Sequence, residues 1–288
     1  MDEQNCILKF EQRNDTLFMG SGHDDFMILP PIEGLTDFPF DVQTTSNPQI
    51  YGVTIDYMKP LERKIRVVFR CKAMLRQRMI HFFNPFISGK LTVTWNGVTR
   101  WINYVSRPIK INQPRPHNPL TVEVELMCRN PYWNHMDDYG KNIAAVQPLI
   151  VFPFVWPVEQ AGYITDYKLL NQKVEILNDG DVSTPIRVIF RCKGEVINPR
   201  LTLNDQEYVR IGTATNPVVM QLGDTVEFDT NPEAIEVLKN GVNIFQFVDP
   251  TNTYFQVPPG DNYIEYGADD GVNNLEVFVY LTPRDSYI

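Results

Sequence analysis

The stretch of sequence that decides the fold is Leu91-Thr-Val-Thr-Trp-Asn-Gly-Val-Thr-Arg-Trp-Ile-Asn-Tyr-Val105. β-Branched and aromatic residues fill both of its halves, and Asn96-Gly97 stands between them. Both residues of an Asn-Gly pair tolerate a positive φ, which a two-residue type I′ turn requires. The stretch therefore predicts an antiparallel β-hairpin over residues 91–105.

Short strand-like runs separated by turn residues continue through the second half of the chain. Pairs such as Asn240-Gly241 and Asp270-Gly271 separate them. Strands at intervals of roughly 8–12 residues with such turns are typical of an antiparallel sandwich. The runs expected to be strands are 173–177, 186–191, 201–203, 207–211, 218–222, 225–229, 242–248, 254–257, 263–266 and 275–281.

One segment, residues 72–83, has helical spacing instead. Leu75, Met79, Phe82 and Phe83 fall at i, i+4, i+7 and i+8, which places them on one face of a helix. Pro85 then stops the helix. We therefore expect an all-β, mainly antiparallel protein with one short helix packed against a sheet.

An octapeptide occurs twice in the chain. Residues 65–72 recur as residues 186–193 and differ only at Val68 against Ile189. Alternation places the Ile, Val, Phe and Cys side chains of each copy on one face of a strand. Convergence on a good half-buried strand and an ancient duplication both explain the echo, and neither implies chemistry.

The length of 288 residues favours two domains, although one large barrel could use it all. Residues 130–133, Asn-Pro-Tyr-Trp, close a strand-like run over 120–127, and strand spacing becomes regular only after residue 172. We therefore expect domains over residues 1–145 and 146–288, with the boundary between 142 and 172.

Composition excludes several classes of protein. Lys and Arg number 26 against 35 Asp and Glu, so the net charge is −9. This balance argues against general nucleic-acid binding and against docking on an anionic membrane. The acidic start, residues 1–6, lacks the features of a secretory signal, and the longest apolar stretch, 144–158, contains three prolines. The sequence predicts a soluble protein made in a cytoplasm.

No residue pattern in the chain carries recognisable chemistry. The four histidines have no metal-binding spacing, and neither a Walker loop nor a dinucleotide fingerprint occurs. The four cysteines lie about 60 residues apart without a C-x-x-C pair, which argues against a disulfide framework or zinc site. We therefore predict no catalytic, cofactor-binding or metal residue. The 12% aromatic content fits either a sugar-stacking platform or core and subunit-interface packing, and we favour packing.

A series of short motifs extends over nearly the whole chain. In the first half they are Leu61-Glu-Arg-Lys64, Phe83-Asn-Pro85, Gly89-Lys-Leu-Thr-Val93 and Asn130-Pro-Tyr-Trp133. In the second half they are Val174-Glu-Ile-Leu-Asn-Asp-Gly-Asp181, Thr184-Pro-Ile186, Asn198-Pro199, Leu222-Gly-Asp-Thr-Val-Glu-Phe-Asp-Thr230, Asn240-Gly-Val-Asn243 and Phe255-Gln-Val-Pro-Pro-Gly-Asp-Asn-Tyr-Ile264. Their order resembles the distal tail proteins, or tail hubs, of phages with long non-contractile tails and of related prophages.

The resemblance implies an N-terminal β-sandwich or split-barrel-like domain with one helix and a protruding hairpin, then a galectin-like β-sandwich. It implies a structural protein without enzyme activity, which forms a homohexameric ring around the channel for DNA and tape-measure protein. The ring would join the tail tube protein to the tail-associated, receptor-binding proteins of host attachment. The protein would lie at the tail tip of the virion, after assembly in the bacterial cytoplasm.

Two interpretations stay open at this point. By analogy, the hairpin with Trp95, Asn96, Gly97 and Trp101 is a reasonable arm for a neighbouring subunit, but it could equally be an ordinary hairpin of the N-terminal domain. The alternative function is a carbohydrate-binding module that recognises the host surface through the C-terminal sandwich. Exposed aromatic side chains on one sheet face would support that function. A glycan hydrolase would need two facing carboxylates.

Overall fold

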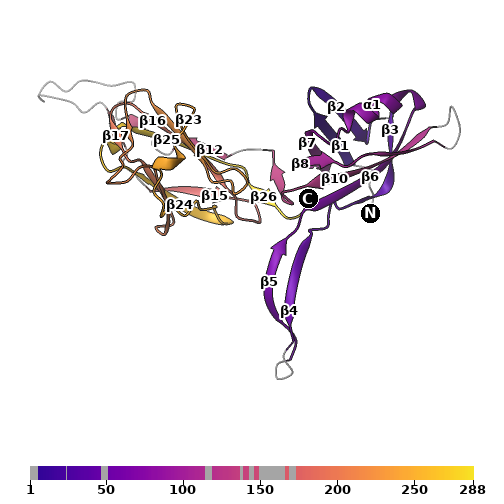
Figure 1. The fold of residues 1–288 in the computed structure, drawn as a ribbon, viewed down its shortest axis with the longest axis horizontal. Coiled ribbons are helices and arrows are strands. Elements are labelled where there is room, and N and C mark those ends of the chain that lie inside the picture. Colours follow the sequence, from indigo (N-terminus) through magenta and orange to yellow (C-terminus); the bar gives the residue numbers. More distant parts are fainter. Residues whose placement is uncertain are drawn as a thin grey trace, which may run out of the picture. The chain divides into compact units, whose positions relative to one another are not determined.

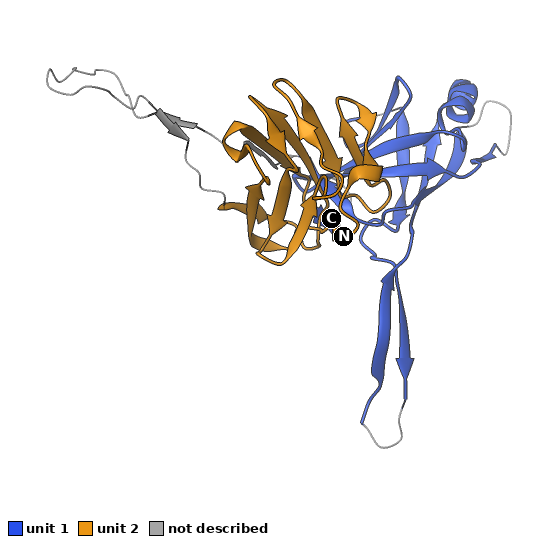
Figure 2. Cartoon of the chain, turned by 60° about the vertical axis from the view of Figure 1, so that its left-hand side comes forward, with its two compact units in different colours: residues 1–136, 284–288 blue, residues 137–283 orange. Residues whose placement is uncertain are grey.

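The computed structural model describes residues 6–23, 25–46, 51–113, 119–136, 139–142, 146–148, 166–168 and 173–288. Among these, only the backbone is described between 139 and 168. The chain forms two compact units (Figure 2), unit 1 with residues 1–136 and 284–288 and unit 2 with residues 137–283. Most of the predicted boundary window falls outside the described residues, so a division at residue 145 stays a prediction. The return of residues 284–288 to unit 1 has no signal in the sequence.

Unit 1 is built on one large antiparallel sheet (Figure 1). The described strands follow the order β2-β1-β7-β8-β10-β6-β3, and β9, β11 and β26 join beside this path. The elements of unit 1 are β1 (Cys6–Gln12), β2 (Asp15–Gly20), β3 (Phe26–Glu33), β4 (Phe40–Thr45), β5 (Thr54–Pro60), β6 (Arg63–Cys71), η2 (Ala73–Leu75), α1 (Arg76–Phe82), β7 (Ser88–Trp95), β8 (Val98–Ser106), β9 (Lys110–Asn112), β10 (Leu120–Cys128), β11 (Trp133–His135) and β26 (Arg284–Asp285).

The sheet of unit 1 curls around a single core. Its two edge strands, β2 and β3, follow one another in the chain and are joined by a short turn. Burial alternates along the strands, and one cluster of buried side chains includes Leu17 of β2, Phe26 of β3 and Val124 of β10. Each such apolar side chain contributes about 1.5–3 kcal/mol by leaving water. This curled sheet fits the split-barrel-like expectation.

The helix and the hairpin of unit 1 lie where the sequence predicts them. A 3-10 turn, Ala73–Leu75, leads into α1, which is the one α-helix among the described residues. Met79, Phe82 and Phe83 are buried in the core, as the predicted helix face requires. Strands β7 and β8 pair as a hairpin, and its turn has a φ of 50° at Asn96 and 86° at Gly97.

Unit 2 is a sandwich of two antiparallel sheets. One has the order β12-β25-β16-β21-β22-β23 and the other β15-β24-β18-β19. A single core cluster takes side chains from both sheets, among them Phe190 and Val277 from the first and Ile264 from the second. The elements are β12 (Tyr139–Asn142), β13 (Val146–Pro148), β14 (Asp166–Lys168), β15 (Lys173–Asn178), β16 (Ile186–Cys192), β17 (Val196–Ile197), β18 (Arg200–Leu203), β19 (Glu207–Arg210), β20 (Val219–Met220), β21 (Thr225–Asp229), β22 (Glu236–Lys239), β23 (Val242–Asn243), η3 (Phe245–Phe247), β24 (Gly260–Gly267), η4 (Val272–Asn274) and β25 (Leu275–Leu281).

The repeated octapeptide forms an interior strand in each unit. β6 lies between β10 and β3, and β16 lies between β25 and β21. In both strands Ile, Val, Phe and Cys are buried. The buried Cys71 and Cys192 are unpaired thiols, and burial raises the pKa of Cys192 to about 11. Both copies of the octapeptide thus lie in core strands with one buried, apolar face.

Two predicted strands of unit 2 are wrong. Residues 242–248 form only the two-residue β23 and then the 3-10 helix Phe245–Phe247, because the Asn243 side chain accepts a hydrogen bond from the Phe245 amide. Residues 254–257 make a single bridge, between Val257 and Thr184. Local side chain to backbone bonding outcompetes the strand ladder here.

No helix among the described residues is long and apolar enough to cross a membrane.

Candidate functional site: a hairpin arm and its arginine anchor

The hairpin of β4 and β5, which we call the arm, leaves the body of unit 1 (Figure 1). All seven residues of β5 are exposed, and in β4 only Val42 is partly covered. Threonine, valine, isoleucine and tyrosine favour the extended conformation of both strands. The arm is therefore a well-formed two-stranded ribbon that packs on neither face within the described part of unit 1.

The arm has one apolar and one polar face. Residues paired directly across a hairpin share a face, and successive residues alternate between faces. Cross-strand pairing joins Phe40 to Pro60, Val42 to Met58, Asp41 to Lys59 and Gln43 to Tyr57. The apolar face thus holds Phe40, Val42, Met58 and Pro60, and the polar face holds Asp41, Gln43, Tyr57 and Lys59.

The exposed apolar face makes the arm an incomplete structure in a single chain. The side chain of Met58 is 60% exposed and that of Phe40 is 49% exposed. A lone two-stranded hairpin is at best marginally stable in water, and a strand edge with exposed apolar side chains invites pairing. On the polar face the Tyr57 hydroxyl donates to Asp41 at 3.0 Å, a bond that raises the pKa of Tyr57. The arm has the properties of a binding element.

A buried arginine anchors the foot of the arm. Arg63, the first residue of β6, is 0% exposed. Its Nε donates to Pro131 O at 2.7 Å, and its Nη2 donates to Ser286 O at 2.7 Å. Its Nη1 donates to the carbonyls of Gly34, Leu35 and Asp37 at 2.8, 3.1 and 2.7 Å. The guanidinium thus ties the loop entering the arm, the 131 turn and the C-terminal segment to β6.

The carbonyl groups around Arg63, which we call its cage, take the place of an ion-pair partner. Burial lowers the pKa of Arg63, an effect that nearby acidic groups partly oppose. An arginine nevertheless stays charged in a protein, so its five N–H groups need acceptors when it is buried. Backbone carbonyls supply them here, and the planar fork matches their positions. The consequence is a foot whose geometry is fixed by one side chain.

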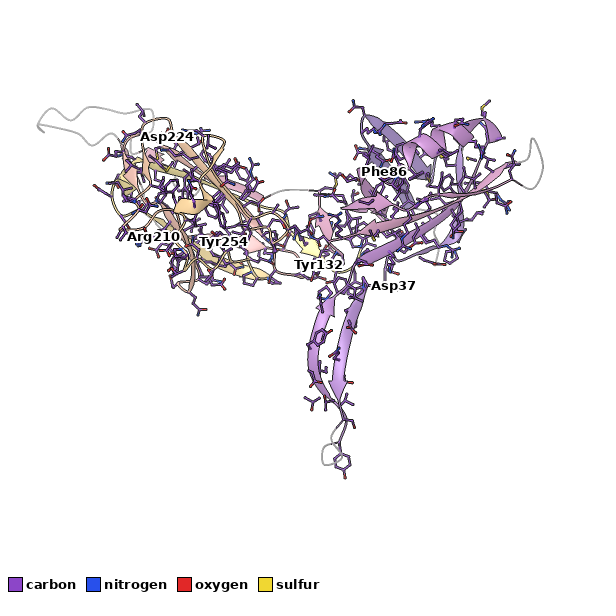
Figure 3. All side chains as sticks on the ribbon, in the orientation of Figure 1. Asp37, Phe86, Tyr132, Arg210, Asp224 and Tyr254 are labelled. Carbon is purple, nitrogen blue, oxygen red and sulfur yellow. The ribbon has the colours of Figure 1, made fainter. Side chains whose placement is uncertain are left out.

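Aromatic rings pack against one another at the same foot, among them Tyr132, which Figure 3 labels. Phe38 stacks on Tyr132 with a centroid distance of 5.4 Å, and lies 6.2 Å from the ring of Tyr287. The Arg63 guanidinium lies 5.8 Å from the Phe38 ring centroid and 5.4 Å from that of Trp133. Such cation–π contacts stabilise a desolvated guanidinium. The arm therefore starts from a rigid base.

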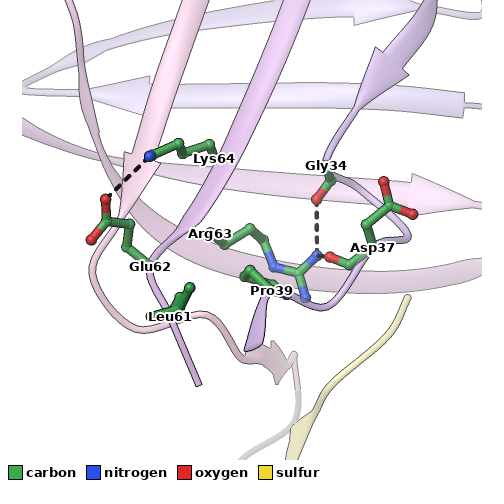
Figure 4. Close-up of a pocket in the computed structure, with 7 residues that line it drawn as sticks. All are labelled: Gly34, Asp37, Pro39, Leu61, Glu62, Arg63 and Lys64. Carbon is green, nitrogen blue, oxygen red and sulfur yellow. Dashed lines mark hydrogen bonds and ion pairs between the residues drawn. The ribbon is translucent and has the colours of Figure 1, made fainter. Parts of the chain in front are cut away.

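A surface pocket of about 400 Å³ opens at this foot (Figure 4). Pro39 and Leu61 give it apolar walls, while Glu62 forms an ion pair with Lys64 at 3.4 Å on its rim. Its other lining residues are Gly34, Asp37 and Arg63. The pocket can receive an apolar side chain of a partner, and it holds no nucleophile beside a base.

The sequence-predicted site residues lie elsewhere in unit 1. Asn96 and Gly97 form the β7–β8 turn, and Trp95 packs against the core from its partly buried position. The indole Nε1 of Trp101 donates to His135 O at 2.8 Å, and Lys90 Nζ lies 4.2 Å from its ring centroid. This hairpin is a part of the large sheet. A subunit contact through it stays a prediction.

The arm itself is the functional element that sequence reasoning missed. Its first strand alternates between apolar and polar residues over 40–43, and that alternation is a signal that could have found it. The motif Leu61-Glu-Arg-Lys64 contains Arg63, but it gives no sign that the side chain is buried, because an arginine at a strand end usually points to solvent. Its role depends on three segments that only the fold brings together.

Two aromatic rings on one sheet face of unit 2 are covered by arginine side chains. On the outer face of the six-stranded sheet, Arg191 covers the ring of Phe278 at 5.5 Å and Arg187 covers that of Tyr280 at 5.8 Å. A pocket of about 190 Å³ nearby is lined by Arg187, Glu227, Asp229, Asn231, Ala234, Glu236 and Leu238, which include no aromatic residue. Among the described residues, no group of three or more His, Cys, Asp or Glu side chains could hold a metal ion.

Comparison with known proteins gives matches at the level of family and fold. Residues 179–283 match the family model of the siphovirus-type tail component, C-terminal domain. A search of curated proteins finds no match. The Dit protein (gp 19.1) of phage SPP1, a hub of the adsorption apparatus in phages that infect Gram-positive bacteria, has a similar fold. Its TM-score is 0.65 at 11% identity, over 96% of this chain and 98% of that one.

A chain of the phage P2 baseplate is also similar. In the activated conformation with Ca its TM-score is 0.56 at 7% identity, over 98% of this chain and 99% of that one. The same values hold for the baseplate with Sr. Identities this low show a common fold, which here extends over both units. Residues 179–283 are therefore similar to the C-terminal domain of siphovirus-type tail components, and the whole chain has the fold of phage tail hub and baseplate proteins.

Proposed function

We propose that the protein is the distal tail hub of a phage or prophage, a ring of six copies that joins the tail tube to the host-attachment apparatus. The observation that carries the proposal is the fold likeness to the SPP1 Dit hub over 96% of the chain. The family match in unit 2 supports it independently of the fold. In this proposal unit 2 is the galectin-like sandwich of the family.

The arm supplies the means of assembly. A ring requires a heterologous contact, in which one surface of a subunit meets a different surface of the next. The arm offers an apolar face that is solvent-exposed in the single chain, on a base fixed by Arg63. In this proposal the arm, rather than the β7–β8 hairpin with Trp95 and Trp101, is the main contact to the neighbouring copy.

The remaining partners follow from the place of a hub in the tail. The tail tube protein would bind one side of the ring and the receptor-binding proteins the other, at the tail tip. The tape-measure protein and DNA would pass through the central channel. A chain with net charge −9 can surround DNA without gripping it, because phosphate binding requires clustered cations. The ring would assemble in the bacterial cytoplasm.

Electron microscopy of the purified full-length protein tests the proposal. We expect particles with six-fold symmetry and a central hole. Open filaments would mean that the head-to-tail contact does not close, and two-fold dimers would mean that the contact is isologous. Either result would contradict the ring. Labelling of phage particles with an antibody against the protein should mark the tail tip, and a label on the capsid would contradict the location.

A further inference from the structure

An aromatic side chain is held out into solvent by a fixed loop. Phe86 is 93% exposed and follows α1 in the loop 84–87. Hydrogen bonds hold the loop in place. The side chain of Gln12, which is 4% exposed, donates to Asn84 O at 3.0 Å and to Ile87 O at 2.6 Å. The Asn84 side chain accepts from the Phe86 amide at 3.0 Å. A pre-organised exposed aromatic ring is a typical anchor of a protein interface.

The helix beside this loop is basic and partly apolar. Residues 70–81 contain four cations and no carboxylate. Two of the cations pair with neighbouring strands and turns, Lys72 with Asp25 at 2.9 Å and Arg78 with Asp15 at 2.9 Å. Arg70 and Arg76 have no ion pair with any described residue. Arg76 and Ile80 stand one turn apart on the exposed side of α1. We call Arg76, Ile80 and Phe86 the α1 surface.

The arm has the opposite charge. Residues 37–62 carry four carboxylates, at Asp37, Asp41, Asp56 and Glu62, and one cation, Lys59. Its exposed apolar face matches the exposed Ile80 and Phe86. The arm and the α1 surface are therefore complementary in both charge and polarity, and complementary potentials favour association in one orientation.

The arm and α1 lie at opposite ends of unit 1. Both views of the molecule place α1 at one end of the unit and the arm at the other (Figure 1, Figure 2). Phe86 lies on the body of the unit, and Asp37 lies at the foot of the arm (Figure 3). A chain cannot bring its own arm to its own α1 surface in this arrangement. A second copy can.

We infer that the arm of one copy docks on the α1 surface of the next, with Phe86 and Ile80 against the apolar face of the arm and Arg76 near its carboxylates. The inference rests on the proposed ring and names the receiving surface of its subunit contact. Because the two surfaces differ and are far apart, the contact is head-to-tail, which is the kind that a ring requires.

Cross-linking of full-length single-cysteine variants tests this contact. The four native cysteines are buried, so an introduced exposed thiol is the accessible one for a short bismaleimide. The variants are Met58→Cys on the arm, Ile80→Cys on α1 and, as a matched control, Val98→Cys at the β7–β8 turn. All three positions are exposed in the single chain. The variants are co-expressed in pairs and singly, and the solution mass is measured beside the cross-linked products.

We expect a covalent dimer from the pair Met58→Cys and Ile80→Cys, and none from either variant alone or from Val98→Cys with Ile80→Cys. A dimer from Met58→Cys alone would show arm-to-arm pairing and overturn the inference. An oligomeric mass without the expected cross-link would overturn the docking surface and leave the hub intact. A monomeric mass at every concentration would overturn the proposed ring and this contact together.

Discussion

At the residue scale, the buried side chain of Arg63 holds together the chain segments that meet at the foot of the arm. Three chain segments far apart in sequence meet on its five N–H groups. Lysine has three donors on a single nitrogen and cannot reproduce a planar fork. The foot therefore depends on an arginine, and removal of the side chain leaves carbonyl groups buried without donors.

Replacement of Arg63 should destabilise unit 1 strongly. We expect Arg63→Met to lower the free energy of unfolding by about 3–5 kcal/mol, because breaking a buried charged network leaves several polar groups unpaired. Arg63→Lys should also be destabilising. Arg70→Met, on the same strand but exposed, is the matched control and should change stability by about 0.5 kcal/mol or less. Denaturant unfolding measures all three, and equal effects of Arg63→Met and Arg70→Met would contradict the anchor.

Asp224 plays a comparable part at a turn of unit 2. Its carboxylate accepts from the Gln221 amide at 3.0 Å and from Asn240 Nδ2 at 2.8 Å, and pairs with Lys239 at 3.0 Å. These bonds lower the pKa of Asp224 from 3.8 to about 2, with the backbone bond from Gln221 as the largest cause. They join the turn before β21 to the turn after β22.

The lowered pKa predicts how the stability of unit 2 depends on pH. Because the pKa of Asp224 is lower in the folded state than in the unfolded state, its contribution is complete above pH 3.8 and is lost as the pH falls towards 2. We expect a contribution of about 1–2 kcal/mol after allowance for solvent screening. Asp224→Asn should remove this part of the acid dependence in denaturant unfolding. An unchanged slope between pH 4 and 2 in that variant would contradict the assignment.

At the element scale, we expect the arm to contribute to assembly and to contribute little to the folding of a single chain. Its apolar face contributes little to the stability of a single chain, because it packs on nothing described within that chain. Met58→Asp should therefore leave the melting temperature nearly unchanged and weaken association. Burying an unpaired carboxylate at an interface costs about 2 kcal/mol or more, which raises a dissociation constant by roughly 30-fold.

Gln43→Asp is the matched control for the arm. It adds the same charge to the polar face of the same hairpin. Light scattering of both variants across concentration should show weakened assembly only for Met58→Asp. Equal loss in both would mean that the net charge of the arm matters and its apolar face does not. A lower melting temperature of Met58→Asp would mean that the arm packs within its own chain.

Elements with strong local signals could be predicted from the sequence. The β7–β8 hairpin follows from Asn96-Gly97, and α1 follows from four apolar residues at helical spacing. The copies of the octapeptide become interior strands with the expected faces. The strand predicted over 242–248 fails because the Asn243 side chain bonds the backbone two residues on, and that competition has no periodicity to reveal it.

The site was less predictable than the fold, for a physical reason. The arm is recognised because its apolar face is exposed, and whether a side chain is exposed depends on the whole fold. Trp95 and Trp101 attract attention as large aromatic residues, yet their hairpin lies inside the sheet of unit 1. The cage of Arg63 joins residues 34, 131 and 286 to residue 63, a set that no local pattern connects.

At the scale of the whole molecule, the chain leaves unit 1 and returns to it. Unit 2 is inserted between β11 and β26, which pair through Trp133 and Asp285. Asp285 also accepts from Arg100 Nε at 2.8 Å and lies 2.8 Å from His135 Nε2. The C-terminal segment is thus fastened into the sheet of unit 1, where Ser286 also closes the cage of Arg63.

A head-to-tail contact between the arm and the α1 surface allows each copy to bind two others. Repetition of one such contact gives a ring if the rotation closes and a filament if it does not. The proposed hub function requires that this contact close into a ring. The proposed function therefore depends on the assembly state of the protein.

Light scattering of the wild-type protein across concentration measures its solution mass and therefore its assembly state. We expect a single assembled species with six times the chain mass of 33.3 kDa, in exchange with monomers on dilution. A protein that stays monomeric at every concentration, or that stops at a dimer, would contradict the proposed ring of six copies.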